Sequence, residues 1–441
     1  MAVWSEIEAS KAFSTSRLDA EFFQPRYVEI EHRLSDAGAV RLEQFLTDIR
    51  YGLNVPPDYV DKGLPFIRAL NLKEYGIEGE VLNIPYTAED VGKINILADG
   101  DLLVVRSGAN VGDVGIVTED LRGGSFGSYV IRLRVKNINP YYLYVFLKCI
   151  FGREQTVRFR SGAAQPNISI PNLKELMICA PLDDQQEEIE KLFFLSYRAK
   201  QKASEIYSEA ENLLLHELEL DTLDLSHELA YERNFSEAAT AGRFDAQYFA
   251  PRYQRAMKLM ARSGQTLGSV APLAKRFFHP VSDEQFNYIE IGNLVGNGQA
   301  ESEVVMGVDA PSRAQWVVEA GDVITSTVRP IRRLTALIEP EQHGFVCSSG
   351  FAVLEPRNIA SELLTVYLRL PIVSEVLDLH TTATMYPAIA TEVLMNIPIS
   401  QPSESTTIEI VNKVQQSRQA REQAKQLLND AKRRVEQMIN Q

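Results

Sequence analysis

The chain carries the same arrangement of motifs twice, and this internal repeat limits its possible folds more than any other feature. The segment 17–27 (Arg-Leu-Asp-Ala-Glu-Phe-Phe-Gln-Pro-Arg-Tyr) returns as 243–253 (Arg-Phe-Asp-Ala-Gln-Tyr-Phe-Ala-Pro-Arg-Tyr), 226 positions later. The tripeptide 166–168 (Pro-Asn-Ile) returns as 387–389 (Pro-Ala-Ile), 221 positions later. Solenoid repeats have units of about 20–50 residues, so this period is far too long for a solenoid. The sequence therefore predicts two similar domains in tandem, with the two-fold character that such a pair brings.

The composition is that of an ordinary soluble protein. With 441 residues and 45% hydrophobic residues, the chain can form two or three cores of about 150 residues each. Its longest apolar runs, such as Tyr141 to Leu147, are far shorter than the roughly 20 residues that cross a bilayer. The first six residues have no basic region before an apolar stretch, so we expect no secretory signal and a cytoplasmic location. Cys149, Cys179 and Cys347 are too widely spaced for a zinc site and are expected to be small buried hydrophobes.

Each repeat is predicted to begin with an amphipathic helix, at 21–34 and at 247–263. A β-rich body follows, because short apolar runs alternate with Gly, Pro, Asn and Asp. The expected strands and helices of the two bodies match in pairs: strands 65–72 with 287–294, strands 100–106 with 321–329, helices 140–151 with 361–379, and closing strands 176–181 with 397–402.

A long helix with a narrow apolar seam is predicted after each body, since apolar and small residues recur there at spacings of three and four. The two seams match at the same offset of 221 positions. Their members are Ile189, Phe193, Ala199, Ala203, Ile206 and Ala210 in the first helix, and Ile410, Val414, Ala420, Ala424, Leu427 and Ala431 in the second. The small alanines favour close packing of the two helices.

Charge favours pairing of these two helices with each other. Residues 183–220 have 10 acidic and 4 basic side chains, whereas residues 404–441 have 5 acidic and 7 basic ones. Opposite signs on facing helices favour the pair over self-association. A helix of about 38 residues is about 57 Å long at 1.5 Å per residue, which suits a spacer. We therefore predict an α+β protein with four parts: domains at 1–182 and 238–402, and helical segments at 183–237 and 403–441.

The sequence contains no motif for catalysis. No glycine-rich loop runs into Lys-Ser or Lys-Thr, the six histidines lack metal-ligand spacing, and no pair of carboxylates stands out. We therefore expect a non-catalytic chain without a metal or cofactor of its own.

The net charge of −14 is unevenly distributed. The segment 183–237 alone has 15 acidic and 5 basic side chains, whereas 153–174 has four basic side chains against one acidic, and 313–333 has four arginines against two acidic residues. Phosphate binding depends on local potential. The overall acidity therefore weakens, but does not exclude, binding to nucleic acid.

Four motifs together resemble a known family. They are the opening Arg-x-Asp-Ala-x-(Phe/Tyr)-Phe, the Gly-Asp run at 100–106 that ends in arginine, the segment 161–169 (Ser-Gly-Ala-Ala-Gln-Pro-Asn-Ile-Ser), and the segment from Leu173 to Gln186. In order and spacing they resemble the specificity (S) subunit of type I DNA restriction-modification enzymes, over essentially the whole chain. The second copy departs from the pattern at 384–387 (Thr-Met-Tyr-Pro) and at 403–406 (Ser-Glu-Ser-Thr).

The resemblance implies two target-recognition domains, held apart by an antiparallel pair of helices. Each domain would read one half of a bipartite double-stranded DNA sequence in the major groove. The helix pair would set the spacing between the halves and dock two methyltransferase (modification) subunits, which supply S-adenosylmethionine. A restriction/translocase subunit would bring ATP and Mg²⁺.

Arginines and amides at strand ends are the candidate DNA contacts, because these side chains read guanine and adenine edges. In the first repeat they are Arg68, Asn71, Arg106, Ser107, Arg158, Arg160, Gln165 and Asn167; in the second they are Asn293, Arg329, Arg332, Arg333, Thr384 and Tyr386. Each arginine could instead form a solvated surface or a weak ion pair, and Gln165 and Asn167 could cap a turn.

A second function also fits the sequence: a degenerate family member that serves as a protein scaffold in a phage-defence complex. The departures in the second copy and the net charge of −14 motivate it.

Overall fold

The computed structural model describes residues 5–15, 17–54, 58–87, 89–92, 95–162, 165–226, 228–382 and 385–440. The chain divides into two compact units: unit 1 contains residues 1–201 and 420–441, and unit 2 contains residues 202–419. Two long helices, α6 (Asp183–Glu217) and α13 (Glu404–Ile439), each contribute one part to either unit. The expected four-part division at 182, 237 and 402 kept these helices apart from the bodies, whereas each half-helix belongs to the core of a unit.

Unit 1 is built around a four-stranded antiparallel sheet in the order β2-β10-β7-β8. Its strands are β2 (Leu46–Tyr51), β10 (Val130–Val135), β7 (Leu102–Val105) and β8 (Val114–Ile116). A second sheet has the order β6-β3-β9, with β6 (Leu82–Ile84), β3 (Leu64–Ile67) and β9 (Ser125–Phe126). Two small pairs complete the unit: β1 (Val40–Arg41) with β11 (Met177–Ile178), and β4 (Leu72–Lys73) with β5 (Gly76–Ile77).

Strand β7 shows why this sheet is the centre of unit 1. All four of its residues are buried, which is typical of a strand covered on both faces. Side chains alternate between the faces of a strand. Accordingly, Leu102 and Val104 lie in the core with the helices, and Leu103 and Val105 lie in a separate core with the second sheet.

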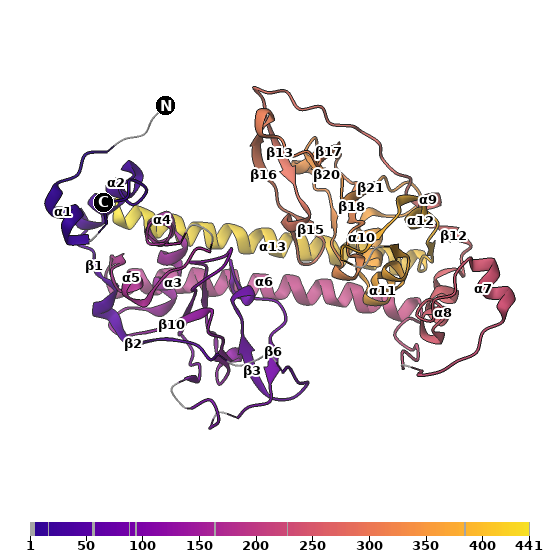
Figure 1. Ribbon diagram of the computed structural model, residues 1–441, viewed down its shortest axis with the longest axis horizontal. Helices are drawn as coiled ribbons and strands as arrows, with labels where there is room; N and C mark the ends of the chain where they lie inside the picture. Colours follow the sequence, from indigo (N-terminus) through magenta and orange to yellow (C-terminus); the bar gives the residue numbers. More distant parts are fainter. Residues whose placement is uncertain are drawn as a thin grey trace. The chain divides into compact units, whose positions relative to one another are not determined.

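The helices of unit 1 are α1 (Ala9–Thr15), α2 (Pro25–Asp36), α3 (Pro140–Lys148), α4 (Ile150–Arg158) and α5 (Ile170–Lys174). Asn139 caps α3, because its side chain accepts hydrogen bonds from the main-chain amides of Tyr141 and Tyr142. Figure 1 shows α3 beside α6 and α4 beside α13. The ring of Tyr141 contacts that of Phe193 on α6, and the amide of Ile150 donates to Glu436 on α13.

Unit 2 repeats this plan with different sheet sizes. A three-stranded sheet has the order β19-β18-β21, and a four-stranded sheet has the order β16-β13-β20-β17. The strands of these sheets are β19 (Thr335–Leu337), β18 (Val323–Ser326), β21 (Phe351–Leu354), β16 (Glu303–Met306), β13 (Gln285–Ile289), β20 (Val346–Ser348) and β17 (Ala314–Val317). Three pairs complete it: β12 (Gln265–Thr266) with β24 (Pro398–Ile399), β14 (Leu294–Val295) with β15 (Gln299–Ala300), and β22 (Thr381–Thr382) with β23 (Ala388–Ile389).

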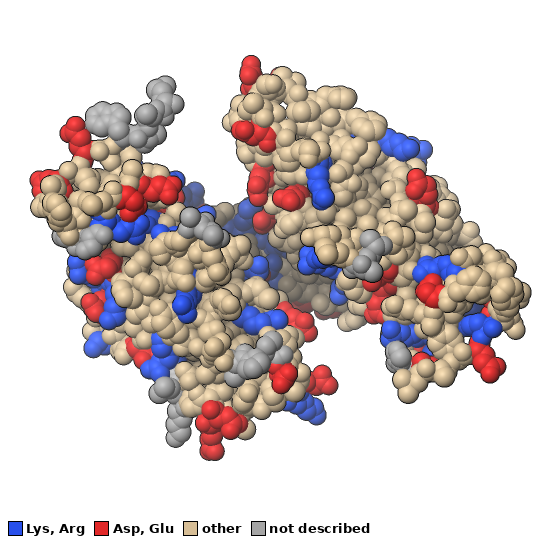
Figure 2. Space-filling model, viewed as in Figure 1, with Lys and Arg blue, Asp and Glu red and all other residues tan. Residues whose placement is uncertain are grey.

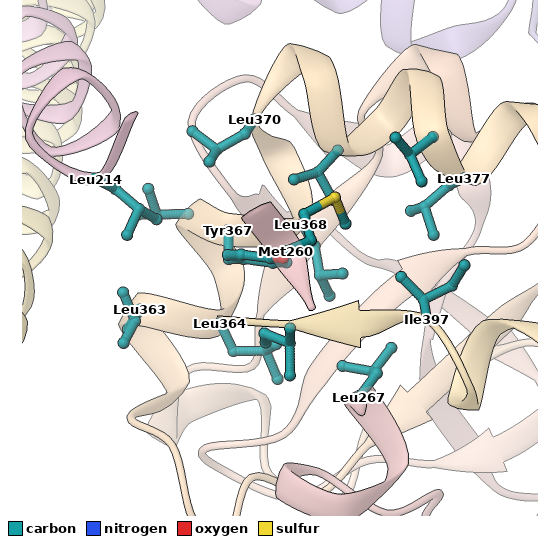
Figure 3. Packing of buried hydrophobic residues seen from close by; sticks show 14 of the residues in the cluster. Leu214, Met260, Leu267, Leu363, Leu364, Tyr367, Leu368, Leu370, Leu377 and Ile397 are labelled. Atoms are coloured by element: carbon teal, nitrogen blue, oxygen red, sulfur yellow. The ribbon is translucent and has the colours of Figure 1, made fainter. Parts of the chain in front are cut away.

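The helices of unit 2 are α7 (Phe235–Ala241), α8 (Pro251–Met260), α9 (Leu267–Val270), α10 (Ser361–Arg369), α11 (Pro371–Leu379) and α12 (Thr391–Met395). Their apolar faces meet in one core, in which Leu214 of α6 lies near Leu363 and Tyr367 of α10 (Figure 3). The same core continues to Met260 of α8 and Ile397 (Figure 3).

The predicted α+β class and the predicted repeat are both confirmed, with shifted boundaries. The opening helices are shorter than expected, because each begins at a proline, Pro25 or Pro251, which favours the first turn. The helix expected at 361–379 is two helices, since Pro371 cannot continue α10 and instead begins α11. The strands expected at 65–72 and 287–294 each end early in a 3₁₀ turn, η2 (Ala69–Asn71) or η5 (Ile291–Asn293).

The two long helices pack antiparallel in each unit. In unit 1, Ser196 Oγ donates to the carbonyl of Ala424 at 2.7 Å, and Glu188 pairs with Arg434. In unit 2, Ser417 Oγ donates to the carbonyl of Ala203 at 2.6 Å. Ser417 is the repeat counterpart of Ser196, and Ala424 is that of Ala203, so one bond is the symmetry copy of the other. The internal repeat therefore extends to the register of the helices.

Four seam residues were predicted one position away from the seam. Ala199, Ile206, Ala420 and Leu427 are half-buried, whereas the neighbouring Tyr207, Arg421 and Leu428 are buried. The other eight predicted seam residues are fully buried or nearly so. The seam follows strict heptad spacing, at 189, 193, 196, 200, 203, 207, 210 and 214 and at 410, 414, 417, 421, 424, 428, 431 and 435. Ala199 and Ala420 were predicted in place of Lys200 and Arg421, because the charged residues at these two heptad positions do not look like seam residues in the sequence.

Enlarging a seam alanine should destabilise the protein. Ala203 and Ala424 have no exposed surface, so leucine at either position has no room without backbone movement. We expect Ala203→Leu and Ala424→Leu each to lower the free energy of unfolding by about 1–3 kcal/mol, measured by urea denaturation. The half-buried Ala199→Leu and Ala420→Leu are matched controls on the same helices and should cost less than about 0.5 kcal/mol. Equal losses at all four positions would contradict the heptad register.

Candidate nucleic-acid interface

Two loops meet at one end of the central sheet in unit 1. The first follows β7, and the second is the Ser-Gly loop around residues 160–168. The amide of Ile168 donates to the carbonyl of Arg106 at 2.9 Å. Ser161 and Asn167 exchange two main-chain hydrogen bonds of 2.9 and 2.8 Å, which close the second loop. Asn167 also forms a bridge with Ser107.

Unit 2 contains the same loop pair. The amide of Ile389 donates to the carbonyl of Thr327 at 2.9 Å, as Ile168 does to Arg106. Strands β22 and β23 close the second loop, and Ala388 bridges Val328 as Asn167 bridges Ser107. These contacts fix a one-to-one correspondence between the two loop pairs at the offset of 221 positions.

In unit 1 the loop pair holds a stacked arginine. The guanidinium carbon of Arg106 lies 4.5 Å from the centroid of the Tyr51 ring. Strand pairing brings them together, because Val105 pairs with Val130 and Tyr51 pairs with Ile131 on the intervening strand β10. The Arg106 Nε is buried without a hydrogen-bond partner. The stack fixes the plane of the guanidinium group through a cation–π contact.

In unit 2 another arginine stacks on another tyrosine. The guanidinium carbon of Arg329 lies 5.1 Å from the centroid of the Tyr386 ring, and its Nη2 donates to the carbonyl of Met385 at 3.1 Å. Arg329 has φ of 50°, a left-handed conformation that non-glycine residues rarely adopt. Its counterpart in unit 1 is Gly108, also at positive φ. The side chain of Arg332, three residues further on, is exposed.

Three candidate residues use their polar groups for contacts within the protein. Asn71 is fully buried: its Oδ1 accepts from the amide of Arg68 and its Nδ2 donates to the carbonyls of Glu78 and Glu80. Arg158 is buried against Phe22 and pairs with Glu31 at 2.8 Å. These two side chains have no surface to offer DNA, because their polar groups are used to hold the fold.

Arg333 is the third residue used internally. Its Nε donates to the carbonyl of Arg369 at 2.6 Å, and its Nη2 pairs with Glu211 of α6 at 2.9 Å. Asn293 plays the same turn-capping role as Asn71, since its Oδ1 accepts from the amide of Glu290 at 2.7 Å. It is half-buried, and its Nδ2 donates to Glu303.

Five candidates remain at or near the surface of unit 1. Arg68 is half-buried, lies 5.4 Å from the Tyr59 ring and donates to the carbonyl of Glu80. Arg160 is half-buried, and its Nε has no hydrogen-bond partner. Ser107 and Asn167 lie in the bridged loops, and Gln165 is exposed at the tip of the second loop. Thr384, a candidate on the second loop of unit 2, lies outside the described residues.

None of the curated proteins matches the chain. Residues 54–207 match the family model of the type I restriction modification DNA specificity domain. The match covers about a third of the chain and places a specificity domain of this family in that segment. The family resemblance drawn from its motifs is therefore confirmed.

Solved structures show distant likenesses. The chain matches over 91% of its length, and over 94% of the other chain, the S subunit of a type I restriction-modification system from M. genitalium, with 15% identity and a TM-score of 0.40. The HsdS subunit from Thermoanaerobacter tengcongensis matches 91% of this chain over 96% of its own, with 16% identity and a TM-score of 0.31. At these values the likenesses carry no information about individual site residues.

Both units also contain site residues that sequence reasoning missed. Tyr51 and Tyr129 are exposed beside Arg106, and the carbonyl of Tyr129 accepts from the Arg106 amide at 2.8 Å. Tyr51 ends a strand that was not predicted, so nothing in the sequence placed it next to Arg106. In unit 2, Ile331 and Met385 are exposed beside Arg329. The sequence could have indicated Ile331 and Met385, since each is a large apolar residue in an otherwise polar loop.

Some of the arginines in the central sheet of unit 1 form ion pairs within the protein. Arg50 and Arg132 both pair with Asp48, and the hydrogen bond from Arg50 above all lowers the pKa of Asp48 to about 2. Asp48 therefore offsets one of these two positive charges, and the Arg132 side chain is buried. On the face of unit 1 displayed in Figure 2, basic and acidic side chains are interspersed. Affinity for a polyanion would thus rest on the few arginines at the loops rather than on a broad basic surface.

The three cysteines are buried free thiols, as expected, and burial raises the pKa of Cys149 to about 12 and that of Cys179 to about 11. No helix in the described part of the chain has both the length and the apolar character that a membrane span requires. Across the same residues, no three His, Cys, Asp or Glu side chains gather into a possible metal site.

Proposed function

We propose that this chain is the DNA-recognition subunit of a type I restriction-modification complex and that each unit reads one half of a bipartite duplex sequence. In this proposal the chain is not itself an enzyme. Two methyltransferase subunits would bind S-adenosylmethionine and modify adenine, and a restriction/translocase subunit would use ATP and Mg²⁺.

One observation carries the proposal: each unit presents a tyrosine-stacked arginine on the same pair of loops. Arg106 stacks on Tyr51 in unit 1, and Arg329 stacks on Tyr386 in unit 2. The two arginines are not repeat counterparts, because Arg106 corresponds to Thr327 and Arg329 to Gly108. If the repeated fold itself required this arginine, the arginine would occupy the same repeat position in both units. Instead, an arginine stacked on a tyrosine occurs at two different positions of the same loop pair.

A stacked guanidinium group is suited to reading bases. Its ring-facing side is covered, and its edge carries N–H donors in a fixed fork that fits the O6 and N7 acceptors of guanine in the major groove. Arg68 and Arg160 of unit 1 are half-buried, and each has a buried Nε that lacks a hydrogen-bond partner. They are suited to phosphate oxygens, which position a protein on the duplex without reading sequence.

The outer faces of the two long helices supply a surface for protein partners. Exposed apolar side chains include Leu195 of α6 and Ile408 of α13. The first helical segment is strongly acidic, which disfavours contact with DNA and suits docking of a protein. We therefore assign the methyltransferase subunits to the outer faces of α6 and α13.

Sequencing of host DNA tests the proposal. With its partner subunits expressed, the chain should direct adenine methylation to a gapped motif with two specified halves. Replacing residues 1–182 by the corresponding domain of another family member should change one half only. If no gapped motif is methylated, the proposal is wrong.

Binding measurements at several salt concentrations separate DNA recognition from a scaffold role. A protein that neutralises phosphates loses affinity with a log–log slope of about −0.9 per contact in duplex DNA. A flat response of the assembled complex, with partner binding intact, would favour a scaffold.

A further inference from the structure

The two loop pairs carry different side chains at corresponding positions. Main-chain contacts align them residue by residue: Ile168 bonds to Arg106 as Ile389 bonds to Thr327. After β18, unit 2 has Arg329, Ile331 and Arg332 where unit 1 has Gly108, Asn110 and Val111. On the second loop, unit 2 has Met385 and Tyr386 where unit 1 has Ala164 and Gln165. The main-chain contacts of the two loop pairs are therefore alike, and the side chains at the ends of the loops differ.

Unit 2 ends in an exposed apolar cluster, which we call the apolar tip (Ile331, Met385 and Tyr386). The exposed fractions of these side chains are 48%, 75% and 65%. Arg329 joins them: it donates to the carbonyl of Met385 and stacks on Tyr386, and Ile331 lies two residues after it in η7 (Pro330–Arg332). Three large apolar side chains exposed on one tip cost solvation free energy unless a partner covers them.

The surroundings of the apolar tip indicate what covers it. Arg329 and the exposed Arg332 are neighbours of the tip in the sequence, so a partner that is also negatively charged is favoured there. A duplex meets both conditions, because phosphates line the groove and the thymine C5-methyl is the apolar group that its major groove presents. The counterparts in unit 1, Asn110 and Gln165, are exposed amides, which suit hydrogen bonding to base edges rather than methyl contacts.

We propose that the apolar tip reads thymine methyl groups, so that unit 2 recognises a thymine-containing half-site by apolar contact while unit 1 reads its half-site without methyl contacts. This inference rests on the proposed function. Arg329 would contact a neighbouring base pair or phosphate, and Ile331 and Met385 would lie against one or two methyl groups.

Deoxyuridine provides the test, because it lacks the methyl group and keeps the base pairing of thymine. The complex of the chain with its methyltransferase subunits is titrated with duplexes carrying the methylated gapped motif. Thymines are replaced by deoxyuridine in one half at a time, at fixed salt. We expect about a fourfold loss of affinity per contacted methyl group in one half-site and none in the other.

Variants assign that half-site to unit 2. Ile331→Asn and Met385→Ala should weaken binding to the thymine duplex and reduce its advantage over the deoxyuridine duplex in the same half. Ile150→Asn is the matched control, since Ile150 has the same exposed fraction of 48% but lies in α4 of unit 1. It should leave the thymine-to-deoxyuridine ratio unchanged.

The outcomes separate the inference from the proposed function. If the complex binds the motif with the same affinity after deoxyuridine replacement in either half, methyl reading is wrong, and DNA recognition by the chain is unaffected. If the Ile331→Asn and Met385→Ala variants both still prefer the thymine duplex over the deoxyuridine duplex as strongly as the original chain does, the assignment of methyl reading to the apolar tip is wrong. Failure of the complex to bind or methylate any gapped motif overturns the proposed function itself.

Discussion

Replacing Asp101 by alanine should destabilise unit 1 by about 3 kcal/mol. The Asp101 side chain is buried and accepts two hydrogen bonds of 2.7 Å from Arg134 and one of 2.8 Å from the amide of Ala98. Its removal leaves the half-buried Ala98 without a partner for its amide and the guanidinium group of Arg134 without its counter-ion. Arg134 remains 37% exposed, so water compensates part of the loss.

The same change in unit 2 should have a similar effect, because Asp322 is the repeat counterpart of Asp101. Asp322 is buried, accepts from the amide of Glu319 at 2.8 Å and pairs with Arg276. Burial raises the pKa of Asp322, and the bonds from Glu319 and Arg276 oppose that rise. The Gly-Asp motif is therefore an anchor for the start of the central strand, and its arginine comes from a different part of the chain in each unit.

Hydrogen exchange localises these effects. We expect faster exchange of amides in β7 and β10 for Asp101→Ala, and in β18 and β21 for Asp322→Ala, with a lower midpoint of urea unfolding in both. The exposed Asp61→Ala and Asp283→Ala are matched controls and should change the free energy of unfolding by less than about 0.5 kcal/mol. A loss no larger than that of the controls would show that the motif is not an anchor.

Much of the fold follows from the sequence because its repeat and periodicity are local signals. The offset of 221 positions predicted the paired elements, and even the hydrogen bonds of Ser196 and Ser417 obey it. Boundaries were less predictable, because a proline that interrupts an apolar run, such as Pro371, leaves the hydrophobic pattern intact. The seam of the two long helices was misplaced at Lys200 and Arg421, because these heptad positions hold charged residues and the prediction considered apolar and small ones.

The site was less predictable than the fold, because burial decides which arginines face solvent. Arg158 and Arg106 look alike in the sequence, yet Arg158 is buried on Phe22 and Arg106 stacks on Tyr51 at the surface. Asn71 ends an apolar strand as a reading residue would, but it caps a turn. Such assignments depend on contacts between residues far apart in the sequence, which a local pattern does not contain.

Arg106→Ala and Arg329→Ala should each relax recognition at one half of the target, and at different halves. A bidentate arginine–guanine contact contributes about 1–3 kcal/mol of discrimination, so we expect about a 5- to 150-fold loss of affinity for the cognate duplex. The loss should vanish for duplexes already mismatched at the base pair that the arginine reads. Competition binding of the assembled complex against a series of single mismatches measures this for each half-site.

Lysine variants distinguish base reading from phosphate contact. Arg106→Lys and Arg329→Lys keep the charge and remove the planar fork, so a base-reading arginine loses most of its discrimination, whereas a phosphate contact keeps its affinity and salt slope. Arg122→Ala and Arg357→Ala remove exposed arginines that pair with nearby glutamates away from the loops, and they should change affinity less than about twofold, as expected for weak surface pairs. If the lysine variants bind and discriminate like the original chain, the stacked arginines hold the DNA backbone, and the bases must be read by the amides and apolar side chains of the loop tips.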